Sequence, residues 1–317
     1  MSRLRRSSAL CAAAALLLAT AACGESGSPT EEAGGLEGVE VTGEFGEAPA
    51  VTVADDFSLD ETSSEQLVEG DGVPLVTAQP ALLHLTLVNA RTGEPAISTY
   101  DQGSPLYLQQ FDDSQLFEAI VEALDGAATG SRFVLGMVPA DLYGEQGNPE
   151  LGIEGEDTVI AVADVVSGPP EETLEGPDGE SVDPPEGTPE VVEEDGAVTG
   201  IDFADASADP PGELTVIPLI EGEGPEARDG SVVTFDYLGQ VYGSGDVFDE
   251  SFSREPSPFG LGVGGLIQAW DEGLVGVKRG SRVMIIAPSD TAYGDQDKPE
   301  IPAGSTLVFV IDVLGVS

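Results

Sequence analysis

Cysteine is nearly absent from this sequence. Of 317 residues only Cys11 and Cys23 are cysteines, and Cys11 lies inside an apolar run near the N-terminus. If that run is removed on export, no disulfide can form within the remaining chain. Small exported domains that lack disulfides must be stabilised by packed cores, so we expect each domain to be of ordinary size.

Basic residues and histidine are also scarce. The chain has 11 Lys and Arg against 59 Asp and Glu, a formal net charge of −48, and a single histidine, His84. Such acidity argues against nucleic acid as a partner and disfavours a polybasic membrane contact. With one histidine and no internal free cysteine, no Ser/His/Asp or Cys/His triad can be assembled. The acidic runs lack the spacing of a calcium-binding loop, so we expect no metal site.

The N-terminal segment is typical of an export signal. Arg3, Arg5 and Arg6 precede an apolar run from Ala9 to Ala22 that is short for a membrane span, and the run ends in TAAC at Cys23. This ending resembles a bacterial lipobox, with Thr20 in place of the usual leucine.

We therefore predict a lipoprotein signal peptide over 1–22, a lipidated Cys23 and a disordered tether over 23–40. The protein would then be exported and anchored by lipid to the outer face of the bacterial cytoplasmic membrane. The alternative is an ordinary secretory signal with an incidental cysteine.

The rest of the chain contains an internal repeat. LFEAIVEALDGAATGSR (116–132) aligns without gaps with LIQAWDEGLVGVKRGSR (266–282), and PADLYGEQG (139–147) resembles PSDTAYGDQ (288–296). ALLHLTLVNA and DTVIAVADVV in the first half pair in the same order with SVVTFDYLGQ and STLVFVIDVL in the second. Ordered matches of this kind indicate a tandem duplication.

The hydrophobic pattern of each copy predicts strands around one short helix. Alternating apolar residues over 83–87 and 233–237 indicate half-buried strands, whereas apolar residues spaced by four over 116–124 and 266–274 indicate amphipathic helices. The fold class predicted is α+β, with two tandem domains, each an antiparallel β-sheet wrapped on one short α-helix. We place the domains at 41–167 and 198–317, joined by an acidic Pro/Gly-rich linker over 168–197.

The second copy resembles an FKBP-type peptidyl-prolyl cis–trans isomerase. VTFDYLGQV, VFDES, LIQAWDEGL, GSRVMIIAP, AYGDQ, IPAG and STLVFVIDVL follow the order and approximate spacing of that family from about Gly212 to Gly315. The resemblance implies isomerase activity on X–Pro bonds, with proline-containing unfolded or exported polypeptides as substrates. It also implies a site for macrolide inhibitors of this class and no cofactor. GLGVGG at 260–265 formally spells G-x-G-x-x-G, but no βαβ unit surrounds it, so we expect no dinucleotide site.

The same resemblance assigns roles to residues. Trp270 would form the floor beneath the proline ring, Tyr293 would donate its hydroxyl to a substrate carbonyl, and Asp249 would face the twisting amide with Arg254 holding it. The N–H of Ile267 would be a further donor. The walls of the pocket would be Tyr237, Phe248, Phe259, Leu266, Ile267 and Phe309. Ser257 or Pro258 stands where the family often has a further aromatic, and charged Asp297, Lys298 and Glu300 line the nearby loop.

The first copy lacks most of these side chains. The internal alignment places Leu87 opposite Tyr237, Ile120 opposite Trp270 and Ala161 opposite Phe309, with Ile97 and Ser98 near Phe248 and Asp249. We therefore predict a degenerate first domain without isomerase activity. The alternative for the whole protein is a non-catalytic chaperone or binding lipoprotein built on the same scaffolds.

Overall fold

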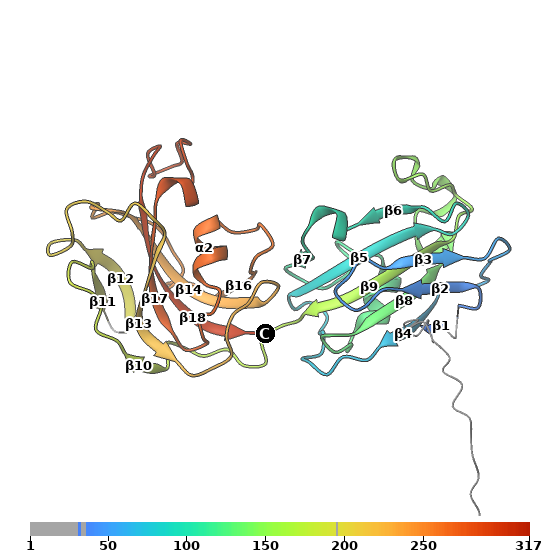
Figure 1. The fold of residues 1–317 in the computed structure, drawn as a ribbon, viewed down its shortest axis with the longest axis horizontal. Coiled ribbons are helices and arrows are strands. Elements are labelled where there is room, and N and C mark those ends of the chain that lie inside the picture. The colour runs from blue at the N-terminus through green and yellow to red at the C-terminus, as the bar shows by residue number, and fades with distance from the viewer. Residues whose placement is uncertain (1–30, 33–35, 195) are drawn as a thin grey trace, which may run out of the picture. The chain divides into compact units, whose positions relative to one another are not determined.

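The computed structural model describes residues 31–32, 36–194 and 196–317 (Figure 1). The predicted signal peptide and Cys23 lie outside this part. Within it, strands dominate, and no helix has both the length and the apolar character needed to cross a membrane. The strands form two larger antiparallel sheets and two smaller hairpin-like sheets.

The first large sheet has the strand order β4-β8-β9-β5-β6, and β7 also pairs with β5. It carries the helix α1 (Glu118–Leu124) on one face. The strands are β4 (Ser63–Val68), β5 (Ala81–Asn89), β6 (Pro95–Ser98), β7 (Leu106–Leu108), β8 (Arg132–Met137) and β9 (Val159–Ser167). Short 3-10 turns lie in its loops at Tyr100–Gln102, Pro139–Asp141, Gly144–Gln146 and Pro149–Leu151.

The second large sheet repeats this arrangement. Its order is β10-β13-β17-β18-β14-β15, with β16 also pairing with β14 and the helix α2 (Gln268–Gly273) on one face. The strands are β10 (Gly179–Ser181), β13 (Thr215–Gly222), β14 (Val232–Val241), β15 (Val247–Glu250), β16 (Ser257–Gly260), β17 (Arg282–Ala287) and β18 (Leu307–Val316). A 3-10 turn spans Ser289–Thr291.

Each helix buries the stripe that the sequence pattern predicts. Ile120 and Leu124 of α1 are completely buried against the first sheet. Trp270 of α2 and Leu274 just after it are buried against the second sheet. Both helices are short, so their stability comes from this packing and not from helix propensity alone.

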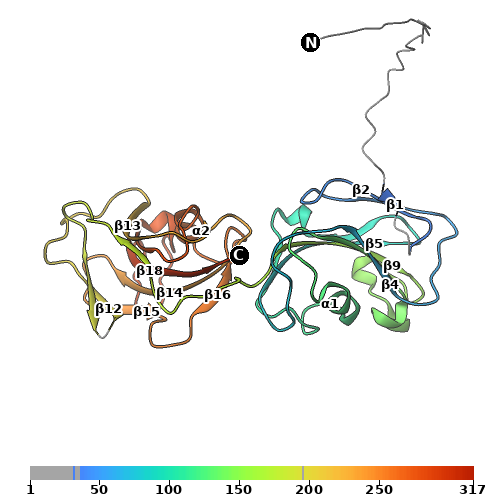
Figure 2. The same cartoon turned by 90° about the horizontal axis from the view of Figure 1, so that it is seen from below.

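A hairpin covers the opposite face of each large sheet (Figure 2). The first combines β2 (Val39–Thr42) and β3 (Ala50–Val53), with β1 (Glu31–Glu32) pairing with β2. The second pairs β11 (Glu190–Glu194) with β12 (Ala197–Asp202). Their buried side chains, Val39 and Val41 in one and Val198 and Ile201 in the other, pack on the sheets, so each sheet has apolar cores on both faces.

A buried ion pair connects each sheet to its hairpin. Arg132 Nε donates to Asp164 Oδ1 at 2.5 Å, and its terminal nitrogens donate to the carbonyls of Gly43 (2.7 Å) and Glu47 (2.8 Å) in the β2–β3 loop. Arg282 bonds Asp312 in the same way and also pairs with Glu193 of β11. The arginine of each repeated GSR segment therefore helps to hold its hairpin in place.

The expected unstructured segments differ from what is observed. Leu36 is fully buried and β2 begins at Val39, so the structured chain starts before residue 40. The segment predicted as a linker contains β10 and β11, and Leu174 N–H donates to Leu314 O at 2.9 Å. Both differences arise because backbone pairing and a few apolar side chains order these segments against a sheet.

Candidate active site in the second sheet

An aromatic cluster surrounds Trp270. The helix α2 turns this side chain toward the sheet, where it is 6% exposed. The rings of Tyr237 and Phe309 meet it edge-on, with centroids 4.9 Å and 5.1 Å away, and Phe248 packs edge-on against Phe309 at 5.8 Å. Four of the predicted site residues are thus brought together from β14, β15, α2 and β18.

Phe259 reaches the cluster through an intermediate ring. It stacks on Phe235 with a centroid distance of 4.9 Å, and Phe235 in turn meets Trp270 edge-on at 5.0 Å. Phe235 is completely buried, so it supports the cluster from within the core. Phe259 remains only partly buried on β16.

Gly239 is a contributor that the sequence analysis did not find. It lies on β14 directly opposite Phe309 of β18, and a Cβ added there would lie 2.6 Å from Phe248 Cζ and 2.9 Å from Phe309 Cε1. The two rings therefore pack over a bare backbone. A glycine inside a strand often marks such a close approach, and this was the available signal.

Polar groups gather at one edge of the cluster. The hydroxyl of Tyr237 donates to Asp249 Oδ2 at 2.5 Å, and Arg254 pairs with Asp249 Oδ1 at 3.2 Å. Arg254 also donates to the carbonyl of Glu250. Burial, followed by the hydrogen bond to Asp249, raises the pKa of Tyr237 to about 12. The predicted pairing of Arg254 with Asp249 is present in the structure.

Two successive hydrogen bonds hold the strand that carries Tyr237. The Tyr237 N–H donates to Ser251 Oγ at 2.8 Å, and the Ser251 hydroxyl donates to Asp236 Oδ1 at 2.8 Å. Burial raises the pKa of Asp236. Sequence reasoning missed Ser251 and Asp236, because neither belongs to the aromatic pattern.

Leu266, Ile267 and Tyr293 lie beside the cluster and pack against it while partly buried. Ile267 is the N-cap of α2 and not a residue of its first turn, and an N-cap N–H has no partner within its helix. Burial first, and then the charge of Asp249, raises the pKa of Tyr293. Lys298 Nζ lies 5.5 Å from the centroid of the Tyr293 ring.

Strand register corrects the internal alignment of the first sheet. Leu85 pairs with Ala163 as Tyr237 pairs with Ile311, and Leu87 pairs with Ala161 as Gly239 pairs with Phe309. The counterpart of Tyr237 is therefore Leu85 and not Leu87, whose counterpart is Gly239.

The same comparison shifts the alignment of β6 with β15 by one residue. Ile97 pairs with Leu87 as Asp249 pairs with Gly239, so Ile97 is the counterpart of Asp249 and Ala96 that of Phe248. The predicted Ser98 corresponds to Glu250. The first sheet still lacks the aromatic and carboxylate side chains of the second.

Other side chains fill the corresponding place in the first sheet. Ile120 is completely buried there, and Phe117, at the position of Ile267, meets the ring of Tyr143 edge-on at 5.2 Å. The shared tyrosine therefore packs on an aromatic ring, whereas Tyr293 lies near Asp249.

The described residues contain no cluster of three or more His, Cys, Asp or Glu side chains arranged to hold a metal ion. The candidate site thus consists of aromatic rings, one exposed carboxylate and hydrogen-bond donors. Such a site can bind an apolar ring and orient a polar amide, but it offers no activated nucleophile.

Comparisons with known proteins agree with this description. Residues 224–314, which run from before β14 into β18, match the family described as FKBP-type peptidyl-prolyl cis–trans isomerase. The FK506-binding protein of Streptomyces anulatus is 39% identical over 119 residues, covering 37% of this chain and 94% of the relative. The probable FK506-binding protein of Corynebacterium glutamicum is 40% identical over 105 residues, covering 33% and 87%. The crystal structure of FkpA from Escherichia coli aligns at 36% identity over 33% of this chain and 48% of that chain, with a TM-score of 0.31.

The chain belongs to the FKBP-type peptidyl-prolyl cis–trans isomerase family. The predicted family, enzyme class and FKBP fold, with antiparallel sheets and few helices, are confirmed at this level.

Proposed function

We propose that residues 198–317, which contain most of the second sheet, carry the isomerase activity of this chain and act on X–Pro bonds of exported polypeptides. The observation that supports this most directly is the ring of aromatic side chains around Trp270, with Asp249 fixed at its edge by Tyr237 and Arg254. This arrangement falls inside the segment that matches the family.

The chemistry follows from the properties of the amide. Resonance gives an X–Pro amide a rotation barrier of ~18–20 kcal/mol, and this resonance is lost when the bond is twisted. The twisted amide is less polar than the planar one, so a dry aromatic surface favours it relative to water. Trp270 supports the proline ring, while Asp249 makes a polar contact with the twisting amide. The N–H of Ile267 and the hydroxyl of Tyr293 hold the flanking carbonyls.

Isomerisation of a proline peptide by the full chain tests this function. We expect acceleration over buffer that is lost in Trp270→Ile, which introduces the residue found at the equivalent position of the first sheet. Phe117→Ile, at the N-cap of α1 in the first domain, is the matched control and should leave the rate unchanged. No acceleration by the unmodified chain would exclude the proposed activity.

We propose that residues 41–167 form a degenerate FKBP-like domain without isomerase activity, in tandem with the second. Its sheet has the same strand pairing around one helix, but Leu85, Ile97, Ile120 and Ala161 occupy the positions of Tyr237, Asp249, Trp270 and Phe309. These side chains supply neither an aromatic floor nor a carboxylate.

The competing function is a chaperone or binding protein that holds unfolded chains without turnover. The preserved first scaffold, which has lost the aromatic cluster, is the observation in its favour. Suppression of client aggregation distinguishes the two functions. If suppression persists in Asp249→Asn and requires the first sheet, the holding function is supported.

We also propose that the protein is exported and held at the membrane by lipid on Cys23. The support is the sequence of residues 1–23 alone. Cell fractionation of the unmodified chain and of Cys23→Ala, with mass spectrometry of the mature N-terminus, tests it. Recovery of the protein in the soluble fraction with an unmodified Cys23 would contradict the lipid anchor.

The relatives named FK506-binding protein suggest an inhibitor for the same site. We propose that FK506 binds the aromatic cluster and competes with proline peptides. The test is inhibition of isomerisation, with loss of FK506 binding in Trp270→Ile.

A further inference from the structure

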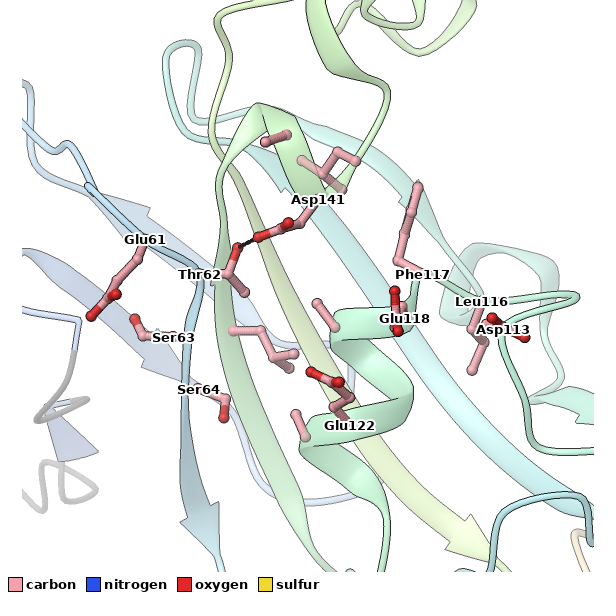
Figure 3. A pocket seen from close by; sticks show the side chains of 15 residues that line it. Glu61, Thr62, Ser63, Ser64, Asp113, Leu116, Phe117, Glu118, Glu122 and Asp141 are labelled. Atoms are coloured by element: carbon pink, nitrogen blue, oxygen red, sulfur yellow. Dashed lines mark hydrogen bonds between the residues drawn. The ribbon is translucent and has the colours of Figure 1, made fainter.

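A cleft of about 820 Å³ lies in the first sheet, beside α1 (Figure 3). Its walls come from the beginning of β4, the chain before and along α1, and the Pro139–Asp141 turn. This volume is in the range of sites that bind ligands of substantial size. The cleft belongs to the domain without the aromatic cluster and is separate from the candidate isomerase site.

Apolar side chains form the smaller part of the lining of the cleft. Leu116, Phe117 and Leu142 are partly exposed there, and the buried Leu135 also lines it. Water in contact with these side chains would be released if another apolar group covered them. A ligand that fits the cleft should therefore carry apolar groups.

The rim of the cleft carries charge of one sign. Glu118 and Glu122 project from α1 at the edge of the cleft (Figure 3). The carboxylates that line it are Glu61, Asp113, Glu118, Glu122 and Asp141, and no Lys, Arg or His is among the lining residues of the described chain. Asp141 accepts a hydrogen bond from Thr62 at 2.6 Å, so its carboxylate is held in place, and all five carboxylates are exposed. A ligand with positive groups beside apolar ones matches this rim electrostatically.

The second sheet differs at the corresponding positions. Ser63 pairs with Gly136 as Thr215 pairs with Ile286, so Thr62 corresponds to Leu214, which packs against the second core. A smaller polar residue therefore stands in the first sheet where the second has an apolar side chain on its core.

The charge differs as well. Asp113, Glu118 and Asp141 correspond to Val263, Gln268 and Thr291, while Ala140 corresponds to Asp290. The first sheet thus carries more acid around this place than the isomerase domain does.

We propose that this cleft binds a segment of unfolded polypeptide that combines basic and apolar side chains and needs no proline. The apolar side chains lie on Leu116, Phe117 and Leu142, and the Lys or Arg side chains reach Asp113, Glu118 and Glu122. The degenerate domain would then hold clients that the isomerase domain does not recognise. This inference goes beyond the proposed isomerase function and does not depend on it.

The test uses the full chain and fluorescent proline-free peptides, which give the isomerase site no substrate. The probe contains Lys, Leu and Ser, and two matched peptides replace Lys by Glu or Leu by Ser. We expect only the Lys/Leu peptide to bind, and a photo-crosslinker on it to label residues 113–123.

The triple variant Asp113→Asn/Glu118→Gln/Glu122→Gln should weaken binding about tenfold, since three exposed charge contacts are lost. The control variant Glu186→Gln/Glu190→Gln/Glu194→Gln makes the same charge change at exposed positions before and along β11 and should bind normally.

Three results would overturn the proposal. They are no binding of the Lys/Leu peptide, equal binding of the Lys/Ser peptide, and equal weakening by both triple variants, which would show general attraction to an acidic protein. Isomerase activity is measured in the same samples, so that failure of either function is recognised separately.

Discussion

The hydroxyl of Tyr237 donates a hydrogen bond to Asp249 at 2.5 Å, across the neighbouring strands β14 and β15. The Asp249 side chain is 52% exposed, so this contact and Arg254, not burial, hold it in position. A carboxylate placed at the edge of an aromatic cluster can reach a bound amide while its charge stays solvated.

Asp249→Asn should lower kcat/KM for proline peptides by about 10- to 100-fold. The amide keeps an oxygen that accepts from Tyr237, but the charge that we propose contacts the twisting amide is lost, and a hydrogen bond to a charged group is worth about 1.5–3 kcal/mol. The matched control is Asp246→Asn, an exposed position on the same hairpin. Equal rates in the two variants would show that Asp249 does not act on the substrate.

Trp270→Phe should retain measurable activity and cost only about 1–2 kcal/mol in the free energy of unfolding. Trp270 Nε1 is buried without a hydrogen-bond partner in the described chain, so its removal leaves no acceptor unsatisfied. Urea unfolding and isomerisation rates check both values. A loss of several kcal/mol would mean that the indole N–H has a partner in solution.

The sequence predicted which elements meet at the site, but not the strand register between the two copies. Leu83, Leu85 and Leu87 all lie on one face of β5, and a shift of two residues leaves that face unchanged. Alternation therefore could not distinguish Leu85 from Leu87 as the counterpart of Tyr237. Asp164 and Asp312, which bind Arg132 and Arg282 on the neighbouring strand, fix the alignment of the two sheets.

The hairpins show a different limit. VTGEFGEAPA, from Val41, resembles VTGIDFADA, from Val198, and this similarity indicates an N-terminal extension in each copy. Its position on the sheet face opposite the helix depends on contacts between distant residues, such as Arg132 with Gly43. No local pattern encodes a contact of this kind.

Gly239→Ala should destabilise the second sheet by about 1–3 kcal/mol and reduce activity, because the new methyl would displace Phe248 and Phe309. Gly245→Ala is the control, since nothing lies within 4 Å of a Cβ at that position. Melting curves and isomerisation rates of both variants are compared. Similar melting of the two variants would show that the rings move aside freely.

Arg132→Gln should cost about 3–5 kcal/mol, because it leaves Asp164 buried without its charged partner. The β2–β3 hairpin also loses the bonds to Gly43 and Glu47, so its amides should exchange hydrogen faster. Arg254→Gln, which breaks an exposed pair, should leave the stability nearly unchanged. Unchanged hydrogen exchange in residues 39–53 would show that the hairpin does not depend on this ion pair.

Ionisation of Tyr237 should make the second sheet less stable at high pH. Its pKa is raised from 10.0 to about 12 in the folded protein, so folding favours the protonated phenol. The resulting stabilisation is complete below about pH 10 and is lost as the pH rises toward 12. Tyr237→Phe cannot ionise, whereas the other tyrosines titrate equally in both proteins. The difference in unfolding free energy between the unmodified chain and Tyr237→Phe should therefore be constant up to about pH 10. Between pH 10 and 12 the unmodified chain should lose stability relative to Tyr237→Phe. Urea unfolding at a series of pH values measures this difference. A constant difference across that interval would contradict a partly buried phenol that is hydrogen-bonded to Asp249.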